Sequence, residues 1–307
     1  MKPPEFDVLG LGCVAVDDLC YVERFPPPDA NTSVLRRTRQ CGGLTATALV
    51  AAARFGARCG YAGCLGDDEL SRFAKAALRR AGVDVRWVVR RAEARPVYSV
   101  IVVDEGAGTR NIFYDLAGVV GADAKRPPAA VLRGTRVLLV DYLGLEGMIR
   151  AARIARAAGI PVVADFDGEA SPRLREAVAL ADHLIVNRVF ARKLTGLAEP
   201  RAAARALWTS ERRAVVVTDG ERGCWYLAGE QGSVPRHQRA FSVPVVDTTG
   251  CGDVFHGAYA ATLARGAGSS ERVAFASAAA ALKAGRRGGQ AGVPTRAAVE
   301  QFLDEHR

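Results

Sequence analysis

Lysine is scarce in this sequence. Five of its 42 basic residues are lysine, and the arginines are spread along amphipathic segments without forming a basic run of five to eight residues. Such runs are typical of nucleic-acid-binding surfaces, so the net charge of +9 does not predict a nucleic-acid partner. A positive net charge also suits a protein whose substrates carry phosphate groups.

Long apolar runs are absent as well. Arginines at positions 54, 79, 153 and 265 interrupt the alanine-rich stretches before the roughly 18 uninterrupted residues that a membrane span needs. The first residues, MKPPEFDVLGLG, place acidic side chains before a short apolar run and lack the basic-then-apolar order of a signal peptide. We therefore expect no membrane partner and a cytoplasmic location.

Cysteine patterns typical of disulfide or zinc proteins are missing. The seven cysteines are odd in number and scattered, and no C-x-x-C pair occurs, so they suit neither a disulfide framework nor a zinc site. His183, His237 and His306 show no spacing for a metal. Buried free thiols are the expected state of the cysteines.

Short apolar runs alternate with longer amphipathic segments along most of the chain. This alternation predicts an α/β fold: a doubly wound, mostly parallel sheet flanked by helices, in a single domain of residues 1–307. Strands are expected at 7–14, 59–64, 137–140, 161–164, 183–186 and 214–218. Helices are expected at 43–55, 67–81, 146–158, 253–265, 270–284 and 295–306, with a further helix starting at Ser171 and Pro172.

Two segments interrupt that rhythm. Residues 17–40 and 86–114 alternate apolar and polar residues, as strands with one solvent-exposed face do. They leave and rejoin the α/β body, so we interpret them as one small β-sheet lid over the strand ends, where it would exclude water from a site. An open edge of such a sheet can pair between subunits, which would give a homodimer.

Three glycine-containing segments each have two interpretations. LGLGCVA, with Gly10, Gly12 and Ala15, matches a dinucleotide fingerprint, but DDLCYVERFPPP follows where a helix is required. CGGLTATALVAAARFGA at 41–57 is either a close backbone approach to a ligand or a plain helix start. VVVTDGERG at 215–223 exposes polar groups at a strand end, or is simply a hairpin turn.

The segment VVDTTGCGDVFHG at 245–257 carries the strongest signal. A strand-like apolar end leads to Gly250, Cys251 and Gly252, whose N–H groups can converge on an oxyanion at a helix N-terminus. Asp253 follows on the first helical turn, where its carboxylate can accept the proton of a hydroxyl that attacks phosphorus. The alternative is a tight connection with Asp253 as an N-cap. Asp17, at the end of the first strand, is either a ligand contact or an ordinary turn residue.

Together, GCVAVDD with FPPPD, the paired-glycine segment and VVDTTGCGDVFHGA resemble the ribokinase (PfkB-type) family of carbohydrate kinases over nearly the whole chain. The tail AALKAGRRGGQAGVP is most similar to the ketohexokinase and sulfofructose kinase branch. The resemblance implies transfer of the γ-phosphoryl group of ATP to a hydroxyl of a small sugar, a ketose such as fructose being favoured. It also implies Mg²⁺ and, in many members, a monovalent cation such as K⁺.

The resemblance assigns roles to residues by position. It implies Asp253 as catalytic base, with the anion hole formed by the backbone of Gly250, Cys251 and Gly252. It implies sugar contacts from Asp17, Gly42, Gly43 and Thr47. It implies nucleotide contacts from Asn187, Thr218, Gly220 and Gly223. It implies a monovalent-cation site, formed mainly by backbone groups, from Asp247, Thr249, Arg286, Gly288 and Gly292.

Three positions depart from the family pattern. Thr47 stands where asparagine is common, Phe190 stands where an acidic residue that assists Mg²⁺ is expected, and Tyr142 aligns with a sugar contact that is glutamate or arginine elsewhere. The sugar, the hydroxyl that is phosphorylated and the way Mg²⁺ is held stay open. A nucleoside kinase, a non-catalytic sugar-binding protein and, on LGLGCVA, an oxidoreductase are the alternatives.

Overall fold

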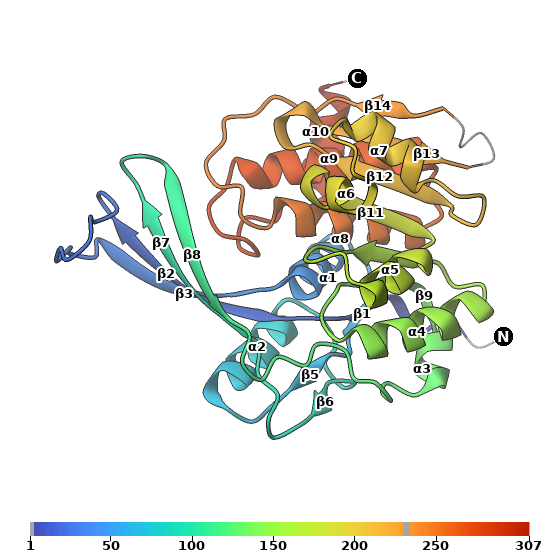
Figure 1. The fold of residues 1–307 in the computed structure, drawn as a ribbon, viewed down its shortest axis with the longest axis horizontal. Helices are drawn as coiled ribbons and strands as arrows, with labels where there is room; N and C mark the ends of the chain where they lie inside the picture. The colour runs from blue at the N-terminus through green and yellow to red at the C-terminus, as the bar shows by residue number, and fades with distance from the viewer. Residues whose placement is uncertain (1–2, 230–233, 307) are drawn as a thin grey trace.

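The central element is an eight-stranded sheet. The computed structural model describes residues 3–229 and 234–306, and its large sheet has the order β14-β13-β12-β11-β10-β9-β1-β4 (Figure 1). From β12 to β4 in this order, neighbouring strands run parallel. At the other edge, β13 and β14 are antiparallel to their neighbours. The strands are β1 (Phe6–Leu11), β4 (Cys59–Tyr61), β9 (Thr135–Val140), β10 (Val162–Asp165), β11 (His183–Asn187), β12 (Ala214–Thr218), β13 (Cys224–Ala228) and β14 (Arg236–Gln238). The predicted mostly parallel α/β sheet is confirmed.

Helices cover both faces of this sheet because successive strand residues point to opposite sides. Val137 and Leu139 of β9 pack into one hydrophobic cluster, while Leu138 and Val140 pack into the other. The first cluster includes α1 (Leu44–Arg54), α2 (Glu69–Arg80), α8 (Cys251–Ala264), α9 (Ser269–Ala284) and α10 (Arg296–Asp304). The second includes α3 (Ala129–Arg133), α4 (Leu145–Ala157), α5 (Pro172–Ala179), α6 (Arg188–Thr195) and α7 (Pro200–Leu207).

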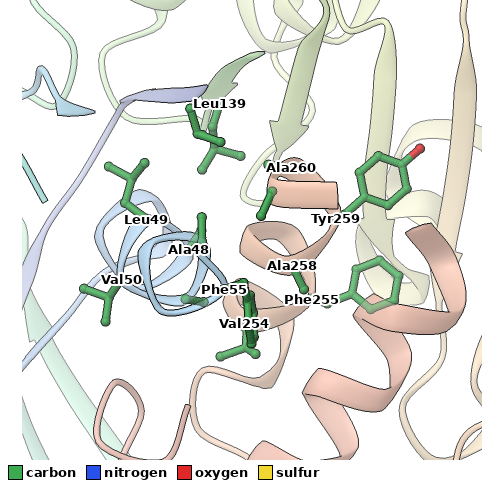
Figure 2. Packing of buried hydrophobic residues seen from close by; sticks show 14 of the residues in the cluster. Ala48, Leu49, Val50, Phe55, Leu139, Val254, Phe255, Ala258, Tyr259 and Ala260 are labelled. Carbon is green, nitrogen blue, oxygen red and sulfur yellow. The ribbon is translucent and has the colours of Figure 1, made fainter. Parts of the chain in front are cut away.

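Helices α1 and α8 pack closely in the first cluster. Figure 2 shows Ala48 of α1 and Phe55, the residue that follows α1, beside Val254 and Ala258 of α8. A Cβ atom added at Gly257 would lie 2.1 Å from the carbonyl oxygen of Ala48, so the two backbones nearly touch. This close approach holds the first turn of α8 in place relative to the sheet.

A second, four-stranded sheet extends from one side of the body (Figure 1). Its order is β3 (Arg36–Gly42), β2 (Ala15–Val22), β7 (Val97–Asp104) and β8 (Thr109–Asp115), so both interrupting segments of the sequence contribute strands to it. Residues 89–90 are an exception, because they form β6 (Val89–Arg90) and pair with β5 (Cys64–Leu65) in a separate two-stranded sheet.

Three local expectations are wrong. The strand expected at 59–64 is split into β4 in the large sheet and β5 in the two-stranded sheet. The first strand ends at Leu11 rather than residue 14, and Gly12, whose φ is +155°, separates it from β2. The strand-like end before Asp247 is not a strand: the side chains of Val245 and Val246 are 67% and 53% exposed. The N–H groups of Val246 and Asp247 instead donate to the carbonyl oxygen of Ala284 at the end of α9, at 2.8 and 3.0 Å.

The cysteine prediction is confirmed, since all seven thiols are free and five of them are buried. Within residues 3–229 and 234–306, none of the helices is both long and apolar enough to cross a bilayer.

Candidate active site

The N-terminus of α8 is open at the point where the sequence predicts an anion hole. Gly250 is the N-cap of this helix with a φ of +77°, a conformation that favours glycine, and α8 begins at Cys251. Asp253 lies in the first turn and makes no capping hydrogen bond, so its interpretation as the N-cap is wrong. The carboxylate is therefore available for another role.

Gly252 is the clearest sign that a ligand approaches this turn. A Cβ atom added there would have no heavy atom within 4 Å outside its own local backbone, and its φ is not positive. Neither packing nor backbone conformation therefore requires glycine at this position. The N–H groups of Gly252 and Asp253 are first-turn donors without partners inside the helix. The N–H of Cys251, in contrast, donates to the carbonyl oxygen of Thr248 at 3.3 Å.

The surroundings of Asp253 favour its neutral form. Burial, followed by the negative charge of Asp165, raises the pKa of Asp253 to about 8, and His256 opposes this shift. Asp141 and Asp17 raise this pKa further. Four carboxyl groups from four separate segments therefore converge near the start of α8. A base with a pKa near neutrality is well matched to proton transfer at physiological pH.

Asp165 and His256 form a buried polar pair behind Asp253. The Nδ1 atom of His256 lies 3.2 Å from a carboxylate oxygen of Asp165 and 2.8 Å from the carbonyl oxygen of Gly252. Its Nε2 atom lies 3.1 Å from the carbonyl oxygen of Ile185, in the middle of β11. The imidazole thus connects the first turn of α8 to the sheet. Sequence reasoning missed Asp165, and the spacing of His256 one turn after Asp253 was the only available signal for this pair.

Asp141 joins the ends of β1 and β9 to α1. Its buried carboxylate accepts hydrogen bonds from the N–H of Cys13 at 2.7 Å, the hydroxyl of Thr45 at 2.8 Å and the N–H of Leu143 at 2.8 Å. These bonds partly offset the burial that raises the pKa of Asp141. Tyr142, the next residue, is partly buried, and burial raises its pKa to about 12.

Asp17 lies on β2 beside the paired glycines. Burial raises the pKa of Asp17 to about 6 against the opposing hydrogen bond from Ser99. A Cβ atom at Gly42 would lie 2.3 Å from the Asp17 carboxylate, and one at Gly43 would lie 2.6 Å from the backbone nitrogen of Ala15. Both glycines are therefore needed for the chain crossing that positions this carboxylate.

Thr47 lies under the anion-hole turn rather than at an open surface. Its side chain is 1% exposed, its methyl carbon is 3.5 Å from the position of a Cβ at Gly250, and its hydroxyl accepts a hydrogen bond from Gln290 at 3.3 Å. Thr47 thus connects α1 to the Gly250 turn and to the loop after α9.

The four predicted nucleotide contacts lie at the ends of β11 and β12. Asn187 caps α6, its side-chain oxygen accepting the N–H of Phe190 at 2.8 Å. Thr218, Gly220 and Gly223 belong to the turn between β12 and the antiparallel β13, which confirms the local hairpin geometry. Gly223 is required there, because a Cβ would lie 2.0 Å from the carbonyl oxygen of Gln238.

Phe190 is fully buried in the second hydrophobic cluster. An acidic side chain at this position would lose its hydration, so the phenylalanine at 190 is part of the hydrophobic core. Asp167, whose partly exposed carboxylate lies 3.5 Å from the amide nitrogen of Asn187, offers an acidic group at the same sheet edge.

The residues of the predicted monovalent-cation site are brought together by Asp247. Its carboxylate accepts the N–H groups of Thr249 and Gly288, each at 2.8 Å, and so joins the loop before α8 to the loop after α9. The amino group of Lys283 lies in the same place and donates to the carbonyl oxygens of Asp247 at 2.7 Å and Arg286 at 3.1 Å. Sequence reasoning did not assign Lys283 to the site.

A hollow of about 320 Å³ lies between the second sheet and the loop before α8. Its lining includes Leu19 and Ile101 from the sheet and Thr248 and Thr249 from the loop. Arg110 of β8 reaches across the hollow, its guanidinium 3.4 Å from the hydroxyl of Thr248. The second sheet is therefore already in polar contact with the segment that leads into α8.

Comparison with known proteins agrees with this geometry. Residues 7–296 match the pfkB family carbohydrate kinase description. The chain is 26% identical to a ribokinase of Haemophilus influenzae over 301 residues, covering 96% of this chain and 97% of that protein. It is 30% identical to fructokinase-1 of Zea mays over 297 residues, covering 86% and 88%. The solved structure of Arabidopsis thaliana ribokinase complexed with ribose and ATP has a TM-score of 0.83 at 24% identity, covering 99% of each chain, and establishes the fold.

The family match spans almost all of the chain and includes every segment that builds the site around α8. The chain therefore belongs to the pfkB family of carbohydrate kinases, phosphotransferases that use an alcohol group as acceptor.

Proposed function

We propose that this protein transfers the γ-phosphoryl group of ATP to a hydroxyl of a small sugar, with Asp253 as the general base. The observation that carries the proposal is the open first turn of α8, where Gly252 leaves room that no protein group fills and Asp253 follows directly. A helix N-terminus of this kind binds phosphate through its N–H groups and its dipole. The Arabidopsis ribokinase complex with ribose and ATP supports this choice of ligands.

In this mechanism Asp253 accepts the proton of the attacking hydroxyl, and the first-turn N–H groups hold the phosphoryl oxygens as charge redistributes. The raised pKa of Asp253 makes its carboxylate a stronger base than a solvent-exposed aspartate. Asp17, beside Gly42, is placed to hold a sugar hydroxyl with its carboxylate. We expect most of the acceleration to come from positioning and electrostatic stabilisation.

Mg²⁺, when bound with ATP, neutralises phosphate charge and is held mainly by the phosphates with one or two protein carboxylates. The donor set fits this demand: Asp167 is a partly exposed carboxylate beside Asn187 at the ends of β10 and β11. We propose that Asp167 and Asn187 assist Mg²⁺·ATP in place of the acidic residue missing at 190. Thr218, Gly220 and Gly223 then provide the nucleotide contacts at the next strand end.

We propose that the second sheet, built from residues 17–40 and 86–114, is a lid over the sugar. Its hollow and the Arg110–Thr248 contact support this, since both lie between the sheet and the loop before α8. The edge strand β8 also exposes Ile112, Phe113 and Tyr114, which are 48%, 57% and 68% accessible. This apolar edge supports pairing of two lids in a homodimer.

A ketose such as fructose is the favoured acceptor, and the maize fructokinase relative supports it. A nucleoside is the second candidate, because the chemistry at Asp253 is the same for any primary or secondary hydroxyl. A coupled ADP-release assay over fructose, other ketoses, ribose, 2-keto-3-deoxygluconate, sulfofructose and nucleosides separates the two. Sugar binding without ADP release for every acceptor would contradict the kinase proposal and favour a non-catalytic binding protein.

A further inference from the structure

Lys283 is an unusual charged residue. It is one of five lysines, and its side chain is fully buried at 0% exposure near the end of α9. Lysine is almost never fully buried unless it has partners, because its ammonium loses hydration. Here the partners are the backbone carbonyl oxygens of Asp247 at 2.7 Å and Arg286 at 3.1 Å.

These two carbonyl groups come from the two loops that meet beside the anion hole. Asp247 lies three residues before Gly250, and Arg286 lies in the loop after α9. Rings of backbone carbonyl oxygens are the ligands that replace the hydration shell of K⁺ in proteins. The ammonium group of Lys283 bonds to two such oxygens, so a monovalent cation and this amino group compete for the same place.

The neighbouring Gly292 packs against the lysine stem. A Cβ atom at Gly292 would lie 2.7 Å from the carbonyl oxygen of Gly288 and 2.8 Å from the Cδ atom of Lys283, so the absence of a side chain at 292 leaves room for both. The residues predicted as a K⁺ site therefore do not fit K⁺ in this chain: Asp247, Arg286 and Gly292 surround a covalently attached cation instead.

We propose that the ammonium group of Lys283 replaces the monovalent cation, so that phosphoryl transfer in this protein does not depend on K⁺. The catalytic part of this inference rests on the proposed kinase function, while the structural part does not. The ammonium joins the Asp247 loop to the Arg286 loop and adds positive charge beside the anion-hole turn. Its charge lies close to that turn, because the carbonyl oxygen of Asp247 that it contacts belongs to a residue three positions before Gly250.

The first experiment measures the wild-type protein in KCl, NaCl and choline chloride at equal ionic strength. We expect the rate of ADP release to agree within about twofold among the three salts, since no K⁺-binding step contributes to transition-state stabilisation. We also expect the melting temperature to be the same in KCl and choline chloride, because a ligand stabilises a protein only when it binds the folded state. A tenfold activation by K⁺, or a melting temperature raised specifically by K⁺, would overturn the proposal.

The second experiment removes the ammonium. Lys283→Ala should lose at least about tenfold in rate in choline chloride, the size expected when an electrostatic contact near the transferring group is lost. K⁺ or NH₄⁺ should restore part of that rate and raise the melting temperature of the variant by about 2 °C or more. Lys125→Ala, at an exposed lysine, is the matched control and should show neither loss nor cation response.

Lys283→Met keeps the volume of the stem if the alanine variant does not fold. Normal rates in choline chloride for a folded Lys283 variant would overturn the catalytic part of the proposal. The melting-temperature comparison of the wild type needs no substrate. It therefore tests the K⁺ inference even if ADP release fails with every acceptor, an outcome that would instead contradict the proposed function.

Discussion

Replacing Asp253 by asparagine separates its catalytic role from its effect on folding. General-base assistance typically contributes about 10² to 10⁴ in rate, so Asp253→Asn should lower turnover at least about a hundredfold. Binding of ATP and sugar should change little, because asparagine keeps the shape of the side chain. The measurement is kcat and KM by ADP release, with ligand binding followed by calorimetry.

The same substitution should stabilise the protein. The pKa of Asp253 is about 8 in the folded protein against an ordinary value of 3.8. Because the pKa of Asp253 is higher in the folded protein, the wild type loses stability as the pH rises from about 4 to about 8. Asparagine does not ionise, so the variant keeps its stability over this range. At about 1.4 kcal/mol per pH unit, this cost is at most several kcal/mol of the free energy of unfolding. Solvent screens the charge of this partly exposed group, so we expect Asp253→Asn to raise the free energy of unfolding by about 1–3 kcal/mol.

Thermal and urea unfolding at pH 5 and pH 8, without ligands, measure this gain. The difference between Asp253→Asn and the wild type should be larger at pH 8. Asp7→Asn is a control with the opposite expected effect on stability. Burial raises the pKa of Asp7, but the Arg58 and Arg136 guanidinium groups outweigh burial and hold this pKa below its usual value. That variant should lose stability, and the loss should disappear as the pH falls below about 4.

Two results would refute the reasoning. Near-normal turnover in a folded Asp253→Asn variant would show that another group accepts the proton. A variant that is less stable than the wild type at pH 8 would show that the carboxylate is ionised and well solvated in the free protein, contrary to the raised pKa of Asp253.

Three further substitutions test the structure around α8. Gly252→Val should fold with nearly normal stability, because open space surrounds this position, yet lose at least about tenfold in kcat/KM for ATP. Gly257→Ala should cost about 1–3 kcal/mol in urea unfolding despite the higher helix propensity of alanine, because its Cβ would meet the Ala48 carbonyl oxygen. Cys251→Ala should keep turnover within about twofold, since only the backbone at 251 is needed; a large loss would give the thiol a role.

Much of the fold was predictable because its information is local. Alternating short apolar runs and amphipathic segments indicate a doubly wound sheet, and the four predicted central strands near 137–140, 161–164, 183–186 and 214–218 lie within about two residues of β9 to β12. The local pattern gave a wrong prediction at Val245 and Val246. Two valines in a row resemble the end of a strand, but here they are exposed and the backbone of Val246 is held by the end of α9.

The site was predictable only where one segment carries it. Gly250 and Asp253 are neighbours in sequence, so their spacing alone places a carboxylate on the first turn of α8. Asp165 and His256 are 91 positions apart by residue number, and their contact exists because β10 and α8 pack together in the fold.

By itself, the sequence determined the alternation of the central strands with most of their helices, the glycine turns and the start of α8, because these depend on neighbouring residues. It did not indicate α3, α6, α7 or the edge strands β13 and β14. Tertiary structure alone decided which charges meet: Asp165 behind Asp253, and Lys283 among the carbonyl groups proposed for K⁺. The physical reason is that charge placement depends on how helices pack across the sheet. No local pattern specifies where the end of a long side chain such as Lys283 will lie.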